Sequence, residues 1–459
     1  MKLARATLPK QAILGLDIGS TFVKAVVFDH RGRALVSAAR SVPVRRPQSG
    51  WVERDALATW RTVADLVRRV TAGRTVSAIG VTGCGNGAVF VAQNLRPLRS
   101  GILSSDQRAV DFVRRDPGAR QTAYAGQTCS LLHWFRAAEP VKARELAYVL
   151  AWKDFIRAKL TGVIATEPTD AGAAGWLDVA RRKLRTDDPA IPPLCESLAS
   201  AGAVTASAAE VTGLREGTPV FMGCIDCEAA ALGSGVSRAG DLSLVAGTWS
   251  ISQMFVDRLP RRSDLFLVNP AVEPGRWLML EGSPTSAANF DWAVRTFAGG
   301  SAARALLLAR QARRTPILFY PHLPTGEGAF RDLDAEHGRG EMLRAVIEGV
   351  AFAHRAHVEK LLAGGSKPRR IRLAGGTARS PFVAQLFADV LGSKIEIPAG
   401  PEIGALGAAL CAGVGLGIWP TLRVAQEVAV RIEAVYMPRP KAHTELTRDF
   451  VRFSQVFPP

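Results

Sequence analysis

The first forty residues alternate between short apolar runs and turns rich in Gly, Asp and hydroxyl side chains. Ile13–Ile18, apolar apart from one Asp, and Phe22–Phe28 are two such runs, and Ala34–Val44 is a weaker third. Runs of this kind bounded by turn residues predict strands joined by hairpins. Ala78–Val81, which ends in glycines, predicts a further strand.

Helices with one buried face are predicted between the strands. Asp55 suits an N-cap, and apolar residues then recur mostly at steps of three and four up to Val70. Closer to the C-terminus, Glu341–Leu362 has the length of a long helix. Ile371–Leu373 predicts a short strand, and the helix after it is expected to begin with Ser380 as its cap.

The strand–turn–strand pattern of the N-terminus returns in the second half. Leu242–Val245 and Ile251–Val256 flank a turn of Gly and hydroxyl residues, as the first two strands do. Such a repeat predicts two halves with one architecture. A Gly- and Ser-rich stretch, Ser234–Gly240, marks the boundary and gives domains over 1–236 and 237–459. Because each half mixes strands and helices, the class is α/β, with a ligand expected in the cleft between the halves.

Composition narrows the class of protein. A chain of 459 residues, 47% apolar and 22% charged, suits two or three globular domains and excludes wholesale disorder and fibrous structure. Six Cys over this length make no disulfide scaffold, so a cytoplasmic setting is expected. We expect no membrane span, which needs about 20 apolar residues, and no signal peptide after the basic residues 1–10.

The net charge of +17 points to anionic partners. The excess is mostly Arg spread along the chain, and the densest groups, at 181–183 and 367–372, are short and carry no interleaved aromatic residues. A solvated basic surface that attracts small anions is therefore favoured, with a nucleic-acid binder as the alternative.

Three turns carry groups that suit phosphate. In the first, Asp17 ends a strand, Ser20 and Thr21 supply hydroxyls, and Lys24 adds a cation. Hydroxyls and free N–H groups suit phosphate oxygens, and an Asp beside them suits hydrated Mg²⁺. An ordinary hairpin turn explains the same residues.

The other two turns lie in the second half. Gly247-Thr248 repeats the first turn without the Asp, and Gly375-Gly376 lies between a strand and the N-terminus of a helix, where bare backbone favours anions. A plain strand-to-helix turn is the alternative for the latter. Three such turns in one chain carry more weight than any one of them.

Asp226 ends another apolar strand in glycine-rich surroundings. A carboxylate there suits proton acceptance from a substrate hydroxyl, and a helix N-cap is the alternative. Cys224 and Cys227 enclose it as CxxC, but no second Cys or His pair lies at zinc-site spacing. Small buried thiols are therefore favoured over a metal or redox site.

Several common motifs are missing. The loop over 83–87 reads GxGxG rather than GxGxxG, so a nicotinamide site is not expected. The sequence has no GxxxxGK[ST] and no HRD or DFG, which excludes a P-loop and a protein kinase. His354 and His357 lie three residues apart without an HExxH, so a polar helix face is favoured over zinc.

Most of the chain is covered by motifs that occur together in one family. They are LGLDIGST (14–21), GWVERD (50–55), GVTGCGNG (80–87), ILSSDQRA (102–109), WKDFIRAKLTG (152–162), GCIDCEAAALGSG (223–235), LVAGTWS (244–250), EGVAFAHRAHVEKL (348–361) and LAGGTARSPFVAQLFADVLG (373–392). In their order and spacing they resemble the FGGY family of carbohydrate kinases, within the actin-like ATPase superfamily.

The resemblance implies two actin-like (ribonuclease H-like) domains that enclose ATP, Mg²⁺ and a sugar or polyol, and that transfer the γ-phosphoryl group to a hydroxyl. We expect a cytoplasmic enzyme with a small-molecule substrate and no nucleic-acid or membrane partner. A homodimer is possible. A non-catalytic sensor of sugar or nucleotide is the alternative, although a pure binder needs no base.

The resemblance also assigns roles to residues. Asp226 matches the catalytic base, and Asp17 matches the residue that organises Mg²⁺ through water. The expected ATP contacts are Gly19, Ser20, Thr21, Lys24, Gly247, Thr248, Gly375, Gly376 and Ser380. The expected sugar contacts are Trp51, Gly85, Asn86, Arg108, Asp226 and Cys227.

The sugar is less well defined because the chain departs from the best-known branches. Xylulose kinases carry Met-His at the positions of Gly85 and Asn86 and Asn at the position of Cys227, and glycerol kinases carry Arg-Glu in the first of these loops. The GxGNG loop with SSDQRA is more similar to the L-xylulose and erythritol kinase branch. The family's GER motif is altered here to Gly-Glu-Gly over 326–328.

Overall fold

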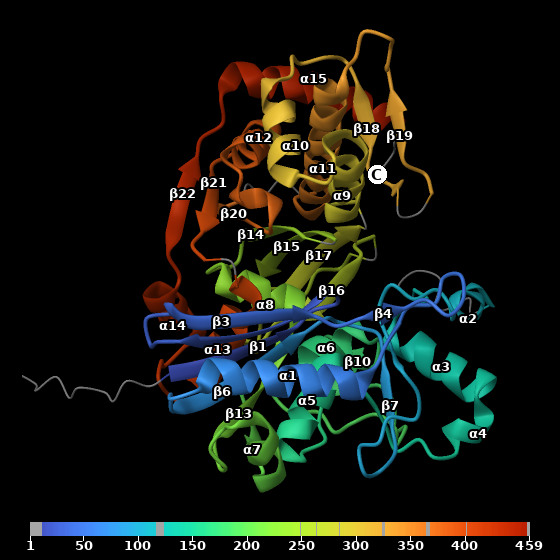
Figure 1. The fold of residues 1–459 in the computed structure, drawn as a ribbon, viewed down its shortest axis with the longest axis vertical. Coiled ribbons are helices and arrows are strands. Elements are labelled where there is room, and N and C mark those ends of the chain that lie inside the picture. Colours follow the sequence, from blue (N-terminus) through green and yellow to red (C-terminus); the bar gives the residue numbers. More distant parts are fainter. Residues whose placement is uncertain are drawn as a thin grey trace, which may run out of the picture.

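The computed structural model describes residues 12–115, 124–247, 249–262, 264–283, 285–323, 326–363, 368–400 and 402–456. It consists of two α/β halves, one above the other in Figure 1. The lower half is built on a six-stranded sheet and the upper half on a seven-stranded sheet. The α/β class with two similar domains is thereby confirmed.

The sheet of the lower half has the order β12-β13-β6-β1-β2-β3. Its strands are β1 (Ala12–Ile18), β2 (Phe22–Phe28), β3 (Ala34–Ser41), β6 (Val76–Gly83), β12 (Ser200–Ala203) and β13 (Pro219–Ile225). The first three form an antiparallel meander, and β6 and then β13 continue the sheet parallel to β1.

The sheet of the upper half repeats this plan, in the order β16-β17-β15-β14-β20-β21-β22. Its strands are β14 (Asp241–Ala246), β15 (Ser250–Val256), β16 (Leu267–Pro270), β17 (Trp277–Ser283), β20 (Arg370–Ala374), β21 (Ile395–Pro398) and β22 (Ile432–Tyr436). Again an antiparallel meander, β14-β15-β17, is continued by two strands parallel to the first, β20 and β21. The two halves therefore share one strand topology, as the repeated strand–turn–strand pattern of the sequence predicted.

Helices cover the sheets and form the main cores. In the lower half, α1 (Ala56–Thr71) and α5 (Trp152–Thr161) pack on one face, while α8 (Asp226–Gly233), α13 (Ile403–Gly415) and α14 (Leu422–Ala429) pack on the other. In the upper half, α9 (Ala287–Ala298), α10 (Ala302–Gln311), α11 (Arg339–Leu361), α12 (Pro381–Leu391) and α15 (Pro440–Val456) share one core. The other face of the upper sheet meets α8, so this helix lies where the halves join.

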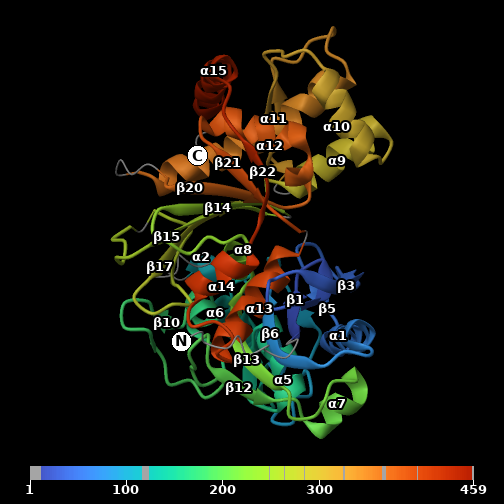
Figure 2. The same ribbon diagram turned by 90° about the vertical axis from the view of Figure 1, so that its left-hand side faces the viewer.

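Helix α13 lies between β21 and β22 of the upper sheet in the chain but packs on the lower sheet (Figures 1 and 2). The backbones touch there, because Gly15 of β1 and Gly80 of β6 leave room for the carbonyl groups of Ala405 and Ala408. The division into 1–236 and 237–459 stays a prediction, and the C-terminal segment contributes helices to both halves.

Local patterns predicted several element bounds well. The strand over Phe22–Phe28 is found with those bounds, and the predicted strand Ile13–Ile18 is one residue longer. Asp55 is the N-cap of α1, and its Oδ1 accepts a hydrogen bond from Ala58 N at 2.9 Å. The third strand ends earlier than expected, at Ser41, because residues 44 and 45 pair with β5 in a separate small sheet.

The remaining elements form insertions around the two sheets. They are β4 (Val44–Arg45), β5 (Glu53–Arg54), β7 (Val89–Val91), β8 (Gly101–Ile102), α2 (Val110–Arg115), α3 (Thr128–Ala138), α4 (Pro140–Ala143), β9 (Tyr148–Leu150), α6 (Pro168–Ala173), β10 (Leu177–Asp178), β11 (Lys183–Leu184), α7 (Ala206–Thr212), β18 (Leu318–Tyr320) and β19 (Ala329–Arg331). Among the described residues, no helix combines the length and the apolar character that crossing a membrane requires.

Candidate active site between the two halves

Three parallel strands of the lower sheet end at the same level. Ile18 of β1 pairs with Gly83 of β6, and Gly83 in turn pairs with Ile225 of β13. The residues that follow these strands therefore meet at one edge of the sheet, and they include the first phosphate turn and Asp226. Ligands of open α/β sheets bind at the carboxyl ends of the strands, so this edge is the candidate site.

Asp226 is the first residue of α8 and follows the N-cap position, which Ile225 occupies. Its Oδ1 accepts a hydrogen bond from Cys227 N at 2.7 Å, and the backbone N–H of Gly85 also donates to this carboxylate. Burial, together with the negative charge of Asp17, raises the pKa of Asp226 to about 7. A carboxylate with this pKa is suited to accept a proton near neutral pH.

The backbone is fixed on both sides of this carboxylate. Before it, Ile225 N donates to Thr169 Oγ1 at 2.9 Å; after it, Cys227 O accepts from Gln253 Nε2 at 2.6 Å. The carbonyl oxygen of Thr169 also accepts from Asn269 Nδ2 at 2.7 Å. Gln253 and Asn269 lie on strands of the upper half, so that half contributes directly to the placement of Asp226.

A cluster of buried charges lies beneath the same strand. Lys153 Nζ is 2.7 Å from Asp154, 2.9 Å from Asp170 and 3.4 Å from Glu167. Glu167 also accepts from the hydroxyl of Thr169 at 2.6 Å. These contacts join α5 and α6 under the base and give the cluster a positioning role.

Asp17 lies beside the first phosphate turn and is buried enough that its pKa is raised to about 6. The positive charge of Lys24 opposes this rise, and the negative charge of Glu402 adds to it. Lys24 Nζ is 2.9 Å from Glu402 Oε2. In the turn itself Ser20 is half-buried and Thr21 is exposed, so both side chains are accessible to a ligand at this edge of the sheet.

The residues around Asp17 fit a hydrated Mg²⁺. Asp17, Asp226 and Glu402 place several carboxylates in one region, and a divalent cation lowers the cost of their charge. Among the described residues, no three His, Cys, Asp or Glu side chains converge into a complete metal cage. Mg²⁺ does not need one, because it keeps water and phosphate ligands and takes only one or two carboxylates.

The other two turns lie at the matching edge of the upper sheet. Val245 of β14 pairs with Ala374 of β20, so Gly247 and Gly375 follow neighbouring strand ends. Gly375 has φ +115°, and a Cβ there would overlap the Ala246 carbonyl, so the turn requires glycine. Gly376 is exposed. Thr248 lies outside the described residues.

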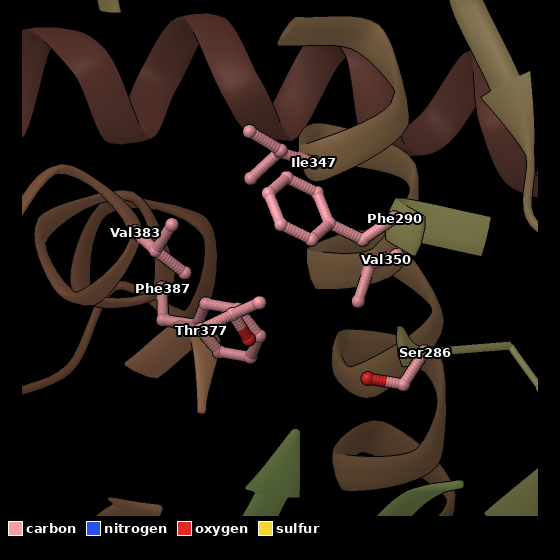
Figure 3. A pocket seen from close by; sticks show the side chains of 7 residues that line it. All are labelled: Ser286, Phe290, Ile347, Val350, Thr377, Val383 and Phe387. Carbon is pink, nitrogen blue, oxygen red and sulfur yellow. The ribbon is translucent and has the colours of Figure 1, made fainter. Parts of the chain in front are cut away.

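Ser380 precedes α12 at the N-cap position, as expected, but its side chain makes no capping hydrogen bond. Next to it a pocket opens between α9, α11 and α12 and the short 3₁₀ turn η3 (Thr377–Arg379), as Figure 3 shows. The lining residues are Ser286, Phe290, Ile347, Val350, Thr377, Val383 and Phe387. This pocket is narrow and mainly apolar, with the hydroxyl groups of Ser286 and Thr377 among its lining groups.

The loop over the base brings together the expected sugar contacts Gly85 and Asn86. A Cβ on Gly85 would overlap Ile225 Cδ1, so this loop lies directly on the strand end. Asn86 has a left-handed backbone, φ 61°, and its Oδ1 accepts from Thr128 N at 3.3 Å. The side chain of Tyr124 is hydrogen-bonded to Asn86. Sequence reasoning missed Tyr124.

Aromatic rings from both halves meet near this loop. The ring centroids of Tyr124 and Phe266 are 5.9 Å apart, and those of Trp249 and Phe266 are 6.1 Å apart. No short motif marks Phe266, which lies directly before β16. Trp249, next to the second turn, carried the only sequence signal for this contact.

Trp51 and Arg108, the weaker sugar candidates, form a separate structural group. The guanidinium group of Arg108 is fully buried and 3.8 Å from the ring centroid of Trp51. It makes two hydrogen bonds of 2.8 Å to Asp106 and lies 2.9 Å from Glu53. Its contacts give it a role in packing, so we do not include it among the proposed sugar contacts.

The structure also shows the surroundings of the two cysteines beside Asp226 and of the two histidines on α11. Cys224 and Cys227 are free thiols, and burial raises the pKa of Cys227 well above its usual value. His354 is fully buried with Nδ1 3.0 Å from Ser252 Oγ, and His357 Nε2 is 3.0 Å from Ser283 Oγ. The expectation of a polar helix face was therefore wrong for His354, which is a core residue.

Two actin-like halves, a buried carboxylate at a strand end and phosphate-suited turns at the strand ends of both sheets are typical of a phosphotransferase of the sugar-kinase type. The N-terminal domain model of the FGGY family of carbohydrate kinases matches residues 12–233, and the C-terminal domain model matches residues 242–416. The chain therefore belongs to the FGGY family of carbohydrate kinases.

Individual proteins with similar sequences or folds are also sugar kinases by name. The chain is 31% identical to the probable L-xylulose kinase of Pasteurella multocida, over 88% of this chain and 90% of that protein. It is 29% identical to the L-xylulose/3-keto-L-gulonate kinase of Escherichia coli, over 96% of each. The crystal structure of the xylulose kinase of Lactobacillus acidophilus shares the fold, with a TM-score of 0.89, 21% identity and 97% coverage of each chain.

Proposed function

We propose that this carbohydrate kinase phosphorylates a hydroxyl group of a ketopentose such as L-xylulose, with ATP as the donor and Asp226 as the general base. The observation that carries the proposal is the position of Asp226. It follows the end of β13, at the same edge of the sheet where β1 ends and the first phosphate turn begins. The similarity to two proteins named L-xylulose kinase supports the choice of sugar.

In the proposed reaction, Asp226 orients the attacking hydroxyl group and accepts its proton. The new bond forms between the sugar oxygen and the γ-phosphorus, while the bond from that phosphorus to the β–γ bridging oxygen breaks and ADP leaves. The turns at Ser20 and Gly247 hold the phosphates from the two halves, and the pocket lined by Phe290 takes the adenine. Asp17 would hold Mg²⁺ through water, and the ion supplies charge neutralisation for the phosphates. Positioning and charge stabilisation account for most of the catalysis in phosphoryl transfer.

The substrate is tested by measuring ADP release from ATP and Mg²⁺ across a panel of ketopentoses, pentitols, tetritols, glycerol and hexonates. Hexonates belong in the panel because the Escherichia coli relative carries 3-keto-L-gulonate in its name. We expect one ketopentose, L-xylulose, to give the highest kcat/KM, with the Asp226→Asn variant as the blank. A tetritol or a hexonate as the best substrate would overturn the proposed sugar but keep the kinase.

The pH dependence follows from the raised pKa of Asp226. Only the ionised carboxylate accepts a proton, so kcat/KM for the sugar should rise about tenfold per pH unit below pH 7 and level off above about pH 8. The measurement is kcat/KM from pH 5 to 9 at constant ionic strength, with ATP binding followed at each pH as the control. A profile that is flat down to pH 5 would contradict a base with this pKa.

A further inference from the structure

Arg54 lies behind the first phosphate turn and is fully buried. Its Nη1 donates to the carbonyl oxygen of Gly19 at 2.8 Å, and the Ser20 carbonyl oxygen is 3.5 Å away. The guanidinium group lies 4.2 Å from the ring centroid of Trp152. Both other nitrogens, Nε and Nη2, are buried without a nitrogen or oxygen partner in the described structure, and the one further neighbour of the group is the thiol of Cys84.

The charge of Arg54 has no counter-charge next to it. Within the described residues no carboxylate forms an ion pair with it, whereas the buried guanidinium groups of Arg108 and Arg157 each pair with an Asp. The neighbouring Cys84 does not supply the charge, because burial raises the pKa of its thiol to about 12. Buried charges are normally paired, so this arrangement calls for an anion from outside the chain.

The hydrogen bond to Gly19 also sets the direction of the turn. All described peptide bonds are trans, and in a trans peptide the C=O and the next N–H point in opposite directions. With the Gly19 carbonyl directed inward to Arg54, the N–H of Ser20 is directed away from it. The longer contact from Arg54 to the Ser20 carbonyl directs the N–H of Thr21 away from Arg54 in the same way.

We propose that Arg54 is a positioning residue for the phosphates of ATP: it holds the first phosphate turn from behind, and the phosphates compensate its buried charge. This inference rests on the proposed function, because it takes the turn at Gly19 to be a phosphate site. Arg54 does not touch the nucleotide itself in this proposal. It acts through the two peptide groups and through its electric field.

The test separates phosphate binding from folding by comparing ATP with adenosine. Arg54→Met removes the charge and the donors at similar length, and Arg54→Gln keeps a neutral donor for the Gly19 carbonyl. For both variants we expect ATP binding at least about tenfold weaker, with adenosine binding within twofold of the original chain. The KM for ATP should rise by a similar factor while the KM for the sugar stays within twofold.

The outcomes distinguish this inference from the proposed function. Unchanged ATP affinity in a folded Arg54→Met, or an equal loss for ATP and adenosine, would overturn the role of Arg54. If that variant does not fold, Arg54→Gln decides the matter by the same comparison. A failure of the original chain to phosphorylate any sugar would refute the proposed substrate, yet the binding ratio of ATP to adenosine would still test Arg54.

Discussion

Replacing Asp226 by Asn should lower kcat by about 10²–10⁴-fold while ATP still binds, since this is the usual contribution of general-base assistance. The amide keeps the size of the side chain and can accept the hydrogen bond from Cys227 N, but it cannot take a proton. The measurement is steady-state ADP release with the best sugar, together with equilibrium binding of ATP. We expect the KM for ATP to change by less than about threefold.

Glu228 provides the matched control for this variant. It lies two residues further along α8, is fully buried, and accepts a hydrogen bond from Val272 N at 2.7 Å. Burial raises its pKa to about 8, so at pH 7 it is mainly protonated and Gln imitates it closely. Glu228→Gln should therefore keep kcat within about threefold. Near-normal turnover of Asp226→Asn, or an equal loss in both variants, would refute Asp226 as the base.

The Asp226→Asn change, which lowers kcat, should not lower the stability of the folded chain. The pKa of Asp226 is about 7 in the folded chain, above its ordinary value of 3.8, so the folded state holds the proton more tightly than the unfolded state. The ionised carboxylate therefore costs stability as the pH rises from about 4 to 7, and that cost is complete above pH 7. A folded Asp226→Asn should melt no lower than the original chain at pH 8, which excludes misfolding as the cause of its low kcat.

Local sequence patterns predicted the elements that carry the site, because local chemistry determines them. The polar turn at Ser20 separates two apolar runs, and Asp55 caps its helix with its own carboxylate. The same reasoning placed Asp226 at a strand end. That Asp17 and Asp226 lie at one edge required the parallel register of β1, β6 and β13, which no local pattern contains.

Contacts between distant segments explain what the sequence did not reveal. Phe290, Ile347 and Phe387 line the pocket proposed for adenine from three helices, and in the sequence each looks like an ordinary core position. Arg54 resembles a solvated charge before a helix, yet it is fully buried behind the phosphate turn. Tyr124 was missed because only the folded loop brings it to Asn86.

Helix α13 is the clearest case of a long-range arrangement. Residues 405–413 are all buried, so the helix has no polar face and no apolar stripe that would indicate its neighbours. Its N-cap, Glu402, pairs with Lys24, and a Cβ on Gly404 would crowd Asp17 Oδ2. A helix from the C-terminal part of the chain thus contributes to the surroundings of Asp17, the residue proposed to hold Mg²⁺ through water.

The close packing of α13 predicts that Gly80→Ala is strongly destabilising. A Cβ at this position of β6 would overlap the backbone carbonyl of Ala408, and neither the strand nor the helix can give way as a flexible side chain could. Overpacking a core costs about 1–3 kcal/mol even when side chains can adjust, so we expect a loss of at least about 3 kcal/mol here. The measurement is urea unfolding, with the yield of soluble chain as a second readout.

Gly376→Ala is the matched control, because it makes the same chemical change where nothing lies within 4 Å of the new Cβ. Its φ of −61° is one that alanine adopts readily, so its stability should stay within about 0.5 kcal/mol of the original chain. A Gly80→Ala variant as stable as this control would show that α13 can move away from β6. Movement of that helix would also displace Glu402 from Lys24, so the variant should then bind ATP and Mg²⁺ more weakly while remaining folded.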